Sequence, residues 1–289
     1  MKRVILFIVF AATLPAPAEK LPPEAILSAA AERPIPVLSK RGHVLTLEDA
    51  YRVQRRFVNA RIAGGERVAG FKAALTSEGS RKRFQLATSL SGVLLRSARL
   101  EPGARVAPGP AEMLMLETEI GYVFGKTITN RVSDNAAIRA AVARIVPAIE
   151  IPNLGFEDMA ALQGPDIVAA NAAMHRFFVG PGSRAADVDP NAVTVSLTKD
   201  EDVVNTGRGT DSMGNQWSAL RWLVNTVVEQ GWTIEPGHVL ITGAMGRMIP
   251  AAPGQYRADF GELGVIEFEV AGPSEESSVP EPHQGPAPH

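Results

Sequence analysis

The sequence has no cysteine among its 289 residues, and its basic residues do not gather into a stripe. The missing thiols exclude a disulfide framework, a thiolate nucleophile and a zinc finger, but they leave the cellular compartment open. With 29 basic and 31 acidic residues the formal net charge is -2, which provides no electrostatic footprint for a nucleic acid. A small molecule is therefore the expected partner.

Several chemical motifs are missing as well. There is no glycine-x-serine-x-glycine elbow of a serine hydrolase, and no phosphate-binding loop of the P-loop or dinucleotide type. No internal repeat is found. What remains is an ordinary globular composition, 45% hydrophobic and 21% charged, in a chain long enough to bury a sizeable core.

The N-terminus has the three-part pattern of a secretory signal peptide. A Lys2-Arg3 pair precedes an apolar run over 4–14, and the small residues Ala16 and Ala18 fit the cleavage rule. The run is too short to span a bilayer comfortably, so no stable membrane anchor is expected. We expect residues 1–18 to be a secretory signal peptide and the protein to be exported to the periplasm. The alternative is a misplaced start codon before a cytoplasmic protein.

The rest of the chain is expected to form one catalytic domain, 19–271, followed by a disordered tail, 272–289, rich in proline, serine, glutamate and histidine. Capping residues and apolar periodicity predict helices over 22–32, 46–64, 134–144 and 215–231. Strands are predicted over 67–75, 193–197, 203–204, 239–242, 255–260 and 265–270. Because strands outnumber helices without regular alternation, the pattern favours a mixed α+β domain over a doubly wound sheet.

Two glutamates one residue apart, Glu117 and Glu119, lie inside the apolar run 113–124. In a strand both carboxylates leave on the same face, and burying two like charges side by side is costly unless a cation neutralises them. The pair therefore indicates half of an oxygen-ligand metal site. The alternative is the wet face of an edge strand, although the same-face neighbours Gly121 and Val123 are not polar.

A third carboxylate, Glu150, stands near the end of another apolar segment, 145–151, just before Pro152. Three carboxylates at strand positions suit a hard ion such as Mg²⁺ or Mn²⁺. Zinc is less favoured, because no cysteine and no paired histidine lie near these residues.

Lys72 lies in a mostly apolar strand, so its side chain has either reached out to water or been retained for chemistry. Burial, or a nearby metal cation, would lower its pKa and make it useful as an acid or base. Judged on this segment alone, the solvent-reaching interpretation is favoured.

Taken together, these segments resemble one family in order and approximate separation. The matching stretches are Lys72, Glu117-Thr118-Glu119, 146–150, 207–209, 239–244 and 259–264. The chain resembles, over about 47–270, the 2-oxopent-4-enoate (2-hydroxypentadienoate) hydratases and 4-oxalocrotonate decarboxylases of the fumarylacetoacetate hydrolase superfamily.

The resemblance implies a mixed β-roll of the fumarylacetoacetate hydrolase C-terminal-domain type with flanking helices, assembled as a homo-oligomer. It implies a metal-dependent lyase of aromatic catabolism, in which Mg²⁺ or Mn²⁺ chelates the carboxylate and the 2-oxo or enol oxygen of a small 2-oxo or 2-hydroxydienoic acid. The residues that match the family's site are Glu117, Glu119 and Glu150 as metal ligands, Lys72 as the proton-transfer residue, and Asn171 and Thr242 as residues that line the pocket.

The chain also departs from the family's pattern. Leu90 stands where many hydratases carry an aspartate, Ala170 and Ala173 replace an aspartate and a serine, and Asn215-Gln216 replaces a histidine-proline pair. The metal ligands are thus kept while part of the proton machinery is lost. Three readings stay open: a hydratase, a decarboxylase of a vinylogous 2-oxo acid, which needs no activated water, or a weakened homologue that binds a 2-oxo acid or is structural.

Overall fold

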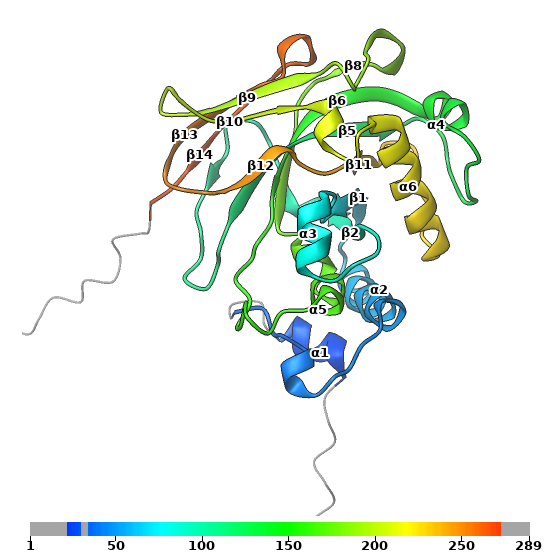
Figure 1. Ribbon diagram of the computed structural model, residues 1–289, viewed down its shortest axis with the longest axis vertical. Helices are drawn as coiled ribbons and strands as arrows, with labels where there is room; N and C mark the ends of the chain where they lie inside the picture. Colours follow the sequence, from blue (N-terminus) through cyan, green and yellow to red (C-terminus); the bar gives the residue numbers. More distant parts are fainter. Residues whose placement is uncertain (1–21, 30–33, 273–289) are drawn as a thin grey trace, which may run out of the picture.

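The structure is a computed structural model that describes residues 22–29 and 34–272. The predicted signal, 1–18, and all but the first residue of the predicted tail lie outside the described residues. Two β-sheets with helices around them make up the described part, and the smaller sheet crosses the top of Figure 1 while α1, α2 and α5 gather at the opposite end. The α+β class predicted from the sequence is confirmed.

Within the described residues the larger sheet has nine strands, and its main path runs β2-β1-β11-β5-β6-β7-β3, with β12 paired to β5 and β8 to β6. Its strands are β1 (Val68–Ala74), β2 (Leu90–Leu95), β3 (Arg99–Leu100), β5 (Met115–Phe124), β6 (Val142–Ile151), β7 (Arg176–Val179), β8 (Ser183–Arg184), β11 (Val239–Ile241) and β12 (Met245–Pro250). The pairings mix parallel and antiparallel strands, with β1 parallel to β11 and β5 antiparallel to both of its main neighbours.

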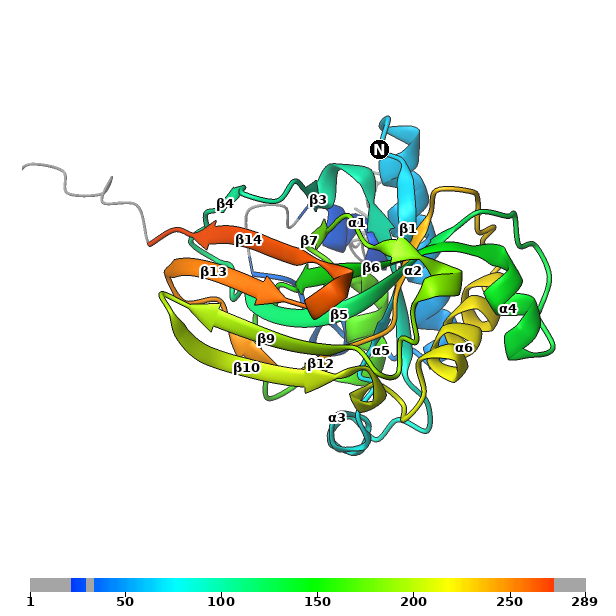
Figure 2. The ribbon, with the colours of Figure 1, turned by 90° about the horizontal axis from the view of Figure 1, so that it is seen from above.

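The smaller sheet has five strands in the order β10-β9-β13-β14-β4. Its strands are β4 (Arg105–Val106), β9 (Thr194–Lys199), β10 (Asp202–Arg208), β13 (Gly254–Asp259) and β14 (Val265–Val270). The predicted strands 193–197 and 203–204 fall in β9 and β10, which form an antiparallel hairpin with Asp202 opposite Lys199 at its turn. Figure 2 shows this sheet on the side of the molecule away from α4 and α6.

The helices are α1 (Pro23–Ser28), α2 (Leu47–Ala63), α3 (Glu78–Arg83), α4 (Asn135–Ala141), α5 (Gly164–Ala169) and α6 (Gln216–Glu229). The helix predicted over 46–64 is confirmed as α2, and a capping box begins it: the Asp49 N–H donates to Thr46 Oγ1, and the Asp49 carboxylate accepts from the Thr46 N–H. Asn215 caps α6 as predicted, with its side chain accepting from the Ser218 N–H.

One predicted helix is too long. The periodicity indicated a helix over 134–144, but α4 ends at Ala141 and the chain enters β6 at Val142. Val142 pairs with Phe124 and Ile145 with Tyr122 in the long β5–β6 ladder. Val142 and Ile145 are β-branched and therefore favour the strand conformation. Tertiary pairing therefore overrides the local helical pattern. The predicted strand ranges did not include β2, β3, β4, β7, β8 and β12.

Strand β5 separates two apolar regions. Ile120 and Tyr122 point into the large core that α6 covers. On the other face, Gly121 and Val123 pack with a smaller buried cluster made of Leu94, Ala98, Val146, Ala148, Phe177, Val179, Val239 and Ile241. This second face carries Glu117 and Glu119 as well, since side chains alternate along a strand.

Within residues 22–29 and 34–272, none of the helices is both long and apolar enough to cross a bilayer.

Candidate metal centre and active site

The three predicted glutamates meet. Glu117 on β5 is in register with Glu150 on β6, and Glu119 follows two residues along the same face of β5. One carboxylate oxygen from each residue lies within 4.8 Å of the others. Glu119 and Glu150 are fully buried and Glu117 is half-buried. The wet edge-strand alternative is wrong, because β5 lies inside the sheet between β11 and β6.

Lys72 reaches the same cluster from β1. Its side chain is only 2% exposed; Nζ forms an ion pair with Glu150 Oε1 and donates a hydrogen bond to the Ala172 carbonyl at 3.0 Å. The solvent-reaching interpretation is therefore wrong. Burial acts to lower the pKa of Lys72, but the charge of Glu150, with that of Glu117, outweighs it and raises the pKa above its ordinary value. The sequence-based expectation of a lowered pKa does not hold in the metal-free site.

Burial raises the pKa of each of the three carboxyl groups. The pKa of Glu117 rises to about 7, because burial and the neighbouring Glu150 charge both disfavour ionisation. Burial and the same neighbour raise the pKa of Glu119 well above its ordinary value. Burial also raises the pKa of Glu150, although the Lys72 ammonium opposes this. The site therefore ionises fully only when an additional positive charge is present.

The charges and the unpaired atoms both fit a divalent cation. Three ionised carboxylates and one ammonium leave a net charge of minus two, which one divalent ion cancels. Among the described residues, no N–H or O–H donates to the buried atoms Glu119 Oε1 and Glu150 Oε2. Buried carboxylate oxygens left without donors are costly, and metal coordination satisfies them. An all-oxygen ligand set suits Mg²⁺ or Mn²⁺.

A backbone donor orients Glu119. The Gly243 N–H donates to Glu119 Oε2 at 2.6 Å. Gly243 has a φ of 105°, and a β-carbon there would lie 2.5 Å from the Thr76 side chain, so only glycine fits. No role was predicted for Gly243 from the sequence. A signal was available, since Gly243 directly follows Thr242 at the end of an apolar strand.

A left-handed turn holds Lys72 in place. Asn171, Ala172 and Ala173 have φ angles of 55°, 53° and 58°, and the turn brings the Ala172 carbonyl to Lys72. Three consecutive non-glycine residues in this region store backbone strain, of a kind that clusters at functional sites. Gly92 on β2 makes room, because a β-carbon there would lie 2.9 Å from the Asn171 carbonyl oxygen.

The two predicted pocket residues lie beside the cluster, but the polar atoms of their side chains form hydrogen bonds to other protein groups. The Asn171 side chain accepts a hydrogen bond from the Val93 N–H at 2.8 Å and donates one to the Val93 carbonyl at 2.9 Å. It thereby satisfies the backbone groups of Val93 on the edge strand β2. Asn171 also borders a cavity of about 680 Å³. Thr242 Oγ1 donates to Gln216 Oε1 at 2.7 Å.

Gln216 was not predicted as a site residue, and it organises the buried network behind Thr242. Its Oε1 also accepts from the Tyr122 hydroxyl at 2.9 Å, and its Nε2 donates to the Gly209 carbonyl at 2.7 Å. Gln216 is fully buried at the first turn of α6. The only sequence signal was its place in the departure from the family's histidine-proline pair.

The replaced positions form an apolar wall. Leu90 is opposite Ala74 in the β1–β2 ladder and Gly92 is opposite Lys72, so Leu90 lies on the Lys72 face of the sheet. Leu90 is fully buried and belongs to the same apolar cluster as Ala173. A hydrocarbon side chain thus fills the position at which the family resemblance led us to expect an acid.

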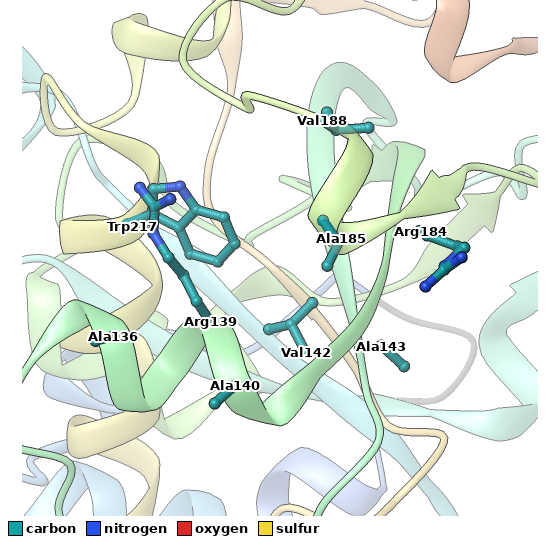
Figure 3. A pocket seen from close by; sticks show the side chains of 10 residues that line it. Ala136, Arg139, Ala140, Val142, Ala143, Arg184, Ala185, Val188 and Trp217 are labelled. Carbon is teal, nitrogen blue, oxygen red and sulfur yellow. The ribbon is translucent and has the colours of Figure 1, made fainter.

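A separate cavity of about 580 Å³ lies between α4, α6 and the segment that follows β8 (Figure 3). Exposed alanines, Arg184 and Arg139 line it, and the Arg139 guanidinium lies 4.5 Å from the centre of the Trp217 ring. None of the predicted site residues lines this cavity, so it is distinct from the carboxylate cluster.

Comparison with known proteins identifies the family. Residues 78–276, more than half of the chain, match the model described as fumarylacetoacetate (FAA) hydrolase C-terminal. A 2-keto-4-pentenoate hydratase of Burkholderia vietnamiensis strain G4 is 31% identical over 221 residues, which are 75% of this chain and 83% of that protein. A 4-oxalocrotonate decarboxylase of Pseudomonas sp. strain CF600 is 28% identical over 211 residues, 73% of this chain and 80% of that protein.

Among solved structures, the 4-oxalocrotonate decarboxylase of Pseudomonas putida G7, complexed with magnesium and adipate, superposes with a TM-score of 0.78 at 25% identity. The match covers 86% of this chain and 98% of that chain. The same enzyme complexed with calcium and acetate gives a TM-score of 0.75 at 24% identity, covering 86% of this chain and 93% of that chain. The predicted β-roll is thereby confirmed, and the chain belongs to the fumarylacetoacetate hydrolase family.

Proposed function

We propose that this protein is a metal-dependent lyase that acts on a small 2-oxo or 2-hydroxydienoic acid. The observation that carries the proposal is the buried cluster of Glu117, Glu119 and Glu150, whose net charge with Lys72 calls for a divalent cation. The similarity to a 2-keto-4-pentenoate hydratase and to a 4-oxalocrotonate decarboxylase supports the reaction class. The magnesium and calcium complexes of a structural neighbour support a divalent metal.

In this proposal the three glutamates hold Mg²⁺ or Mn²⁺. The bound ion supplies Lewis acidity and a chelation site for the carboxylate and 2-oxo oxygens of the substrate. Gly243 fixes one oxygen of Glu119, so that the other faces the ligand position. Fixed ligands cost no reorganisation when charge develops during the reaction.

Lys72 holds and moves the proton. An ammonium has three N–H donors, and Glu150 and the Ala172 carbonyl engage two of them. The remaining donor is available to a substrate oxygen or carbon at the cluster. Because a divalent cation lowers the pKa of a neighbouring ammonium, the metal-bound site favours proton release more than the metal-free site does.

Hydration of the dienoic acid is the reaction that the names of most of the relatives favour, and decarboxylation of a vinylogous 2-oxo acid is the second candidate. Leu90 favours the second, because an aliphatic side chain cannot activate water and decarboxylation needs only the electron sink. The third candidate, a weakened homologue that binds a 2-oxo acid without turnover, rests on Leu90, Ala170 and Ala173.

A thermal melt with metal and oxalate, a mimic of the chelating 2-oxo acid, tests the proposal. We expect Mg²⁺ or Mn²⁺ to raise Tm, oxalate to raise it further, and both shifts to vanish in Glu119→Gln, since only the native state binds. A lyase then shows metal-dependent loss of dienoate absorbance, whereas a binding homologue shows the shifts without turnover. If neither metal nor oxalate moves Tm, the proposed function is wrong.

Homo-oligomeric assembly and export after removal of residues 1–18 are further proposals. Light scattering of the purified protein tests the first. The mass of the N-terminal peptide, recovered from the periplasmic fraction of an expressing cell, tests the second.

A further inference from the structure

Arg81 lies on α3, at the end of the sheet where the metal ligands meet. Strands β1 and β11 run parallel with Lys72 opposite Ile241, so the residues that follow both strands leave at the same end as Lys72. The chain turns into α3 directly after this point, and Figure 1 shows α3 in front of the β1 and β2 strands. Helix α3 therefore lies at the same end of the sheet as the carboxylate cluster.

A short series of contacts connects Arg81 to the metal ligands. Arg81 Nη1 donates to the Thr76 carbonyl at 2.5 Å. The Thr76 side chain packs directly against Gly243, and the Gly243 N–H donates to Glu119. The Arg81 guanidinium is thus held close to the carboxylate cluster by residues that are themselves part of the site's rim.

The charge of Arg81 is not matched by an acid. Within the described residues no carboxylate lies in ion-pair contact with this half-buried guanidinium, whose other neighbour is Ser89 Oγ at 3.5 Å. The adjacent cations of α3 differ: Lys82 is exposed and paired with Glu78, and Arg83 lies over the Phe84 ring at 5.4 Å. Of these three cations, Arg81 is the half-buried one, and only its Nη1 group takes part in the hydrogen bonds described above.

We propose that Arg81 forms a subsite for a second carboxylate, so that the substrate is a dicarboxylic 2-oxo acid. The inference rests on the proposed function, in which the first carboxylate and the 2-oxo group bind at the metal. A planar guanidinium with free donors binds a carboxylate through two parallel hydrogen bonds. With Lys72 and a divalent ion balancing the three glutamates, Arg81 provides the additional positive charge that a dianionic substrate needs.

The Arg81 subsite favours one of the reactions left open above. Loss of carbon dioxide from a vinylogous 2-oxo acid requires a second carboxylate on the carbon chain, whereas hydration of a monocarboxylic dienoate does not. The bond between that carboxyl carbon and the chain breaks, its electron pair moves into the conjugated 2-oxo system, and a proton later replaces it on carbon. Arg81 would select the substrate that carries this group and hold it at the rim.

A matched pair of non-reacting ligands tests the inference, namely 2-oxoadipate and 2-oxohexanoate, which have the same chain length and differ in the distal carboxylate. Calorimetric titration of the full-length protein with each ligand, in saturating Mg²⁺, gives the two values of Kd. We expect 2-oxoadipate to bind about tenfold to a hundredfold more tightly, the range for a charge-assisted pair. Arg81→Gln should remove this preference and change the Kd of 2-oxohexanoate less than about twofold.

Two further variants control the experiment. Arg81→Lys keeps the positive charge but loses the planar guanidinium that forms two parallel hydrogen bonds, so it should retain part of the preference for 2-oxoadipate. Lys82→Gln removes the same charge from the solvent side of the same helix, and it should leave both Kd values unchanged. Equal binding of the two ligands by the unmodified protein overturns the inference, and so does an equal loss of both in Arg81→Gln. If neither ligand binds in Mg²⁺, the proposed function itself fails.

Discussion

Lowering the pH from 8 to 6 should weaken metal binding, because the metal-free site holds protons that the ion must displace. The pKa of Glu117 rises to about 7, through burial and the Glu150 charge, and burial raises the pKa of Glu119 further. Only ionised carboxylates bind the metal, so binding releases protons. Affinity for Mg²⁺ should therefore increase with pH across this range.

The size of the effect follows from Glu117. A rise in pKa from 4.5 to about 7 means that ionisation of Glu117 is disfavoured by roughly 3 kcal/mol. The true free-energy cost is smaller, because the side chain is half-buried and water screens part of the interaction. A group with this pKa is mostly ionised at pH 8 and mostly protonated at pH 6, which weakens binding by about tenfold. The pKa of Glu119 is also raised, by burial and by the Glu150 charge, so protonation of this ligand acts in the same direction.

The stability of the metal-free protein should change with pH in the opposite direction. The Glu117 carboxyl group ionises near 4.5 in the unfolded chain, whereas burial and the Glu150 charge raise its pKa to about 7 in the folded site. The folded state then binds more protons, so the free energy of unfolding falls as the pH rises through this window. Saturating Mg²⁺ should remove this loss.

Calorimetric titration with Mg²⁺ between pH 6 and 8, in buffers of different ionisation enthalpy, measures both Kd and the number of protons released. Glu119→Gln serves as the control, since it removes one titrating ligand and should lower the proton count as well as the affinity. A Kd that changes less than twofold over this range, without proton release, would refute the reasoning from buried carboxylates.

Three substitutions separate the parts of the site. Gly243→Ala should destabilise the protein by about 1–3 kcal/mol in urea unfolding and weaken Mg²⁺ binding, because alanine resists the φ of 105°. Lys72→Met should abolish turnover while Mg²⁺ still binds at pH 8 by calorimetry, since a repelling charge next to Glu150 is removed; loss of metal binding there would contradict this. Asn171→Ala should cost about 1–3 kcal/mol, because both backbone groups of Val93 lose their partner, and an unchanged Tm would show that water replaces the amide.

Part of the site could be predicted because it depends on local periodicity. Alternation along one strand places Glu117 and Glu119 on the same face, and this needs no knowledge of the rest of the fold. Their meeting with Glu150 depends on the register of β5 against β6, which the sequence pattern does not specify, and the family resemblance supplied it. The capping residues at the starts of α2 and α6 were predictable for the same local reason.

Other features depend on contacts that are distant in sequence. The burial of Lys72 follows from Glu150, 78 residues away, and from the Ala172 carbonyl on a left-handed turn. Alanine gives no signal for that turn, because its backbone preference opposes a positive φ. The buried role of Gln216 likewise arises only when α6 packs against β5 and β11.

The apolar wall excludes water while the charged cluster binds the substrate, and together they favour one of the two candidate reactions. Leu90 and Ala173 exclude water from the Lys72 face, which lowers the local dielectric and strengthens every charge interaction in the cluster. The aliphatic Leu90 side chain also offers no acid or base that would activate water for addition. A site that concentrates positive charge on the substrate while it keeps water away suits departure of a carboxylate better than addition of a hydroxyl. Leu90→Asp therefore separates the two reactions: a gain of hydration would show that the wall, and not the substrate, decides the outcome.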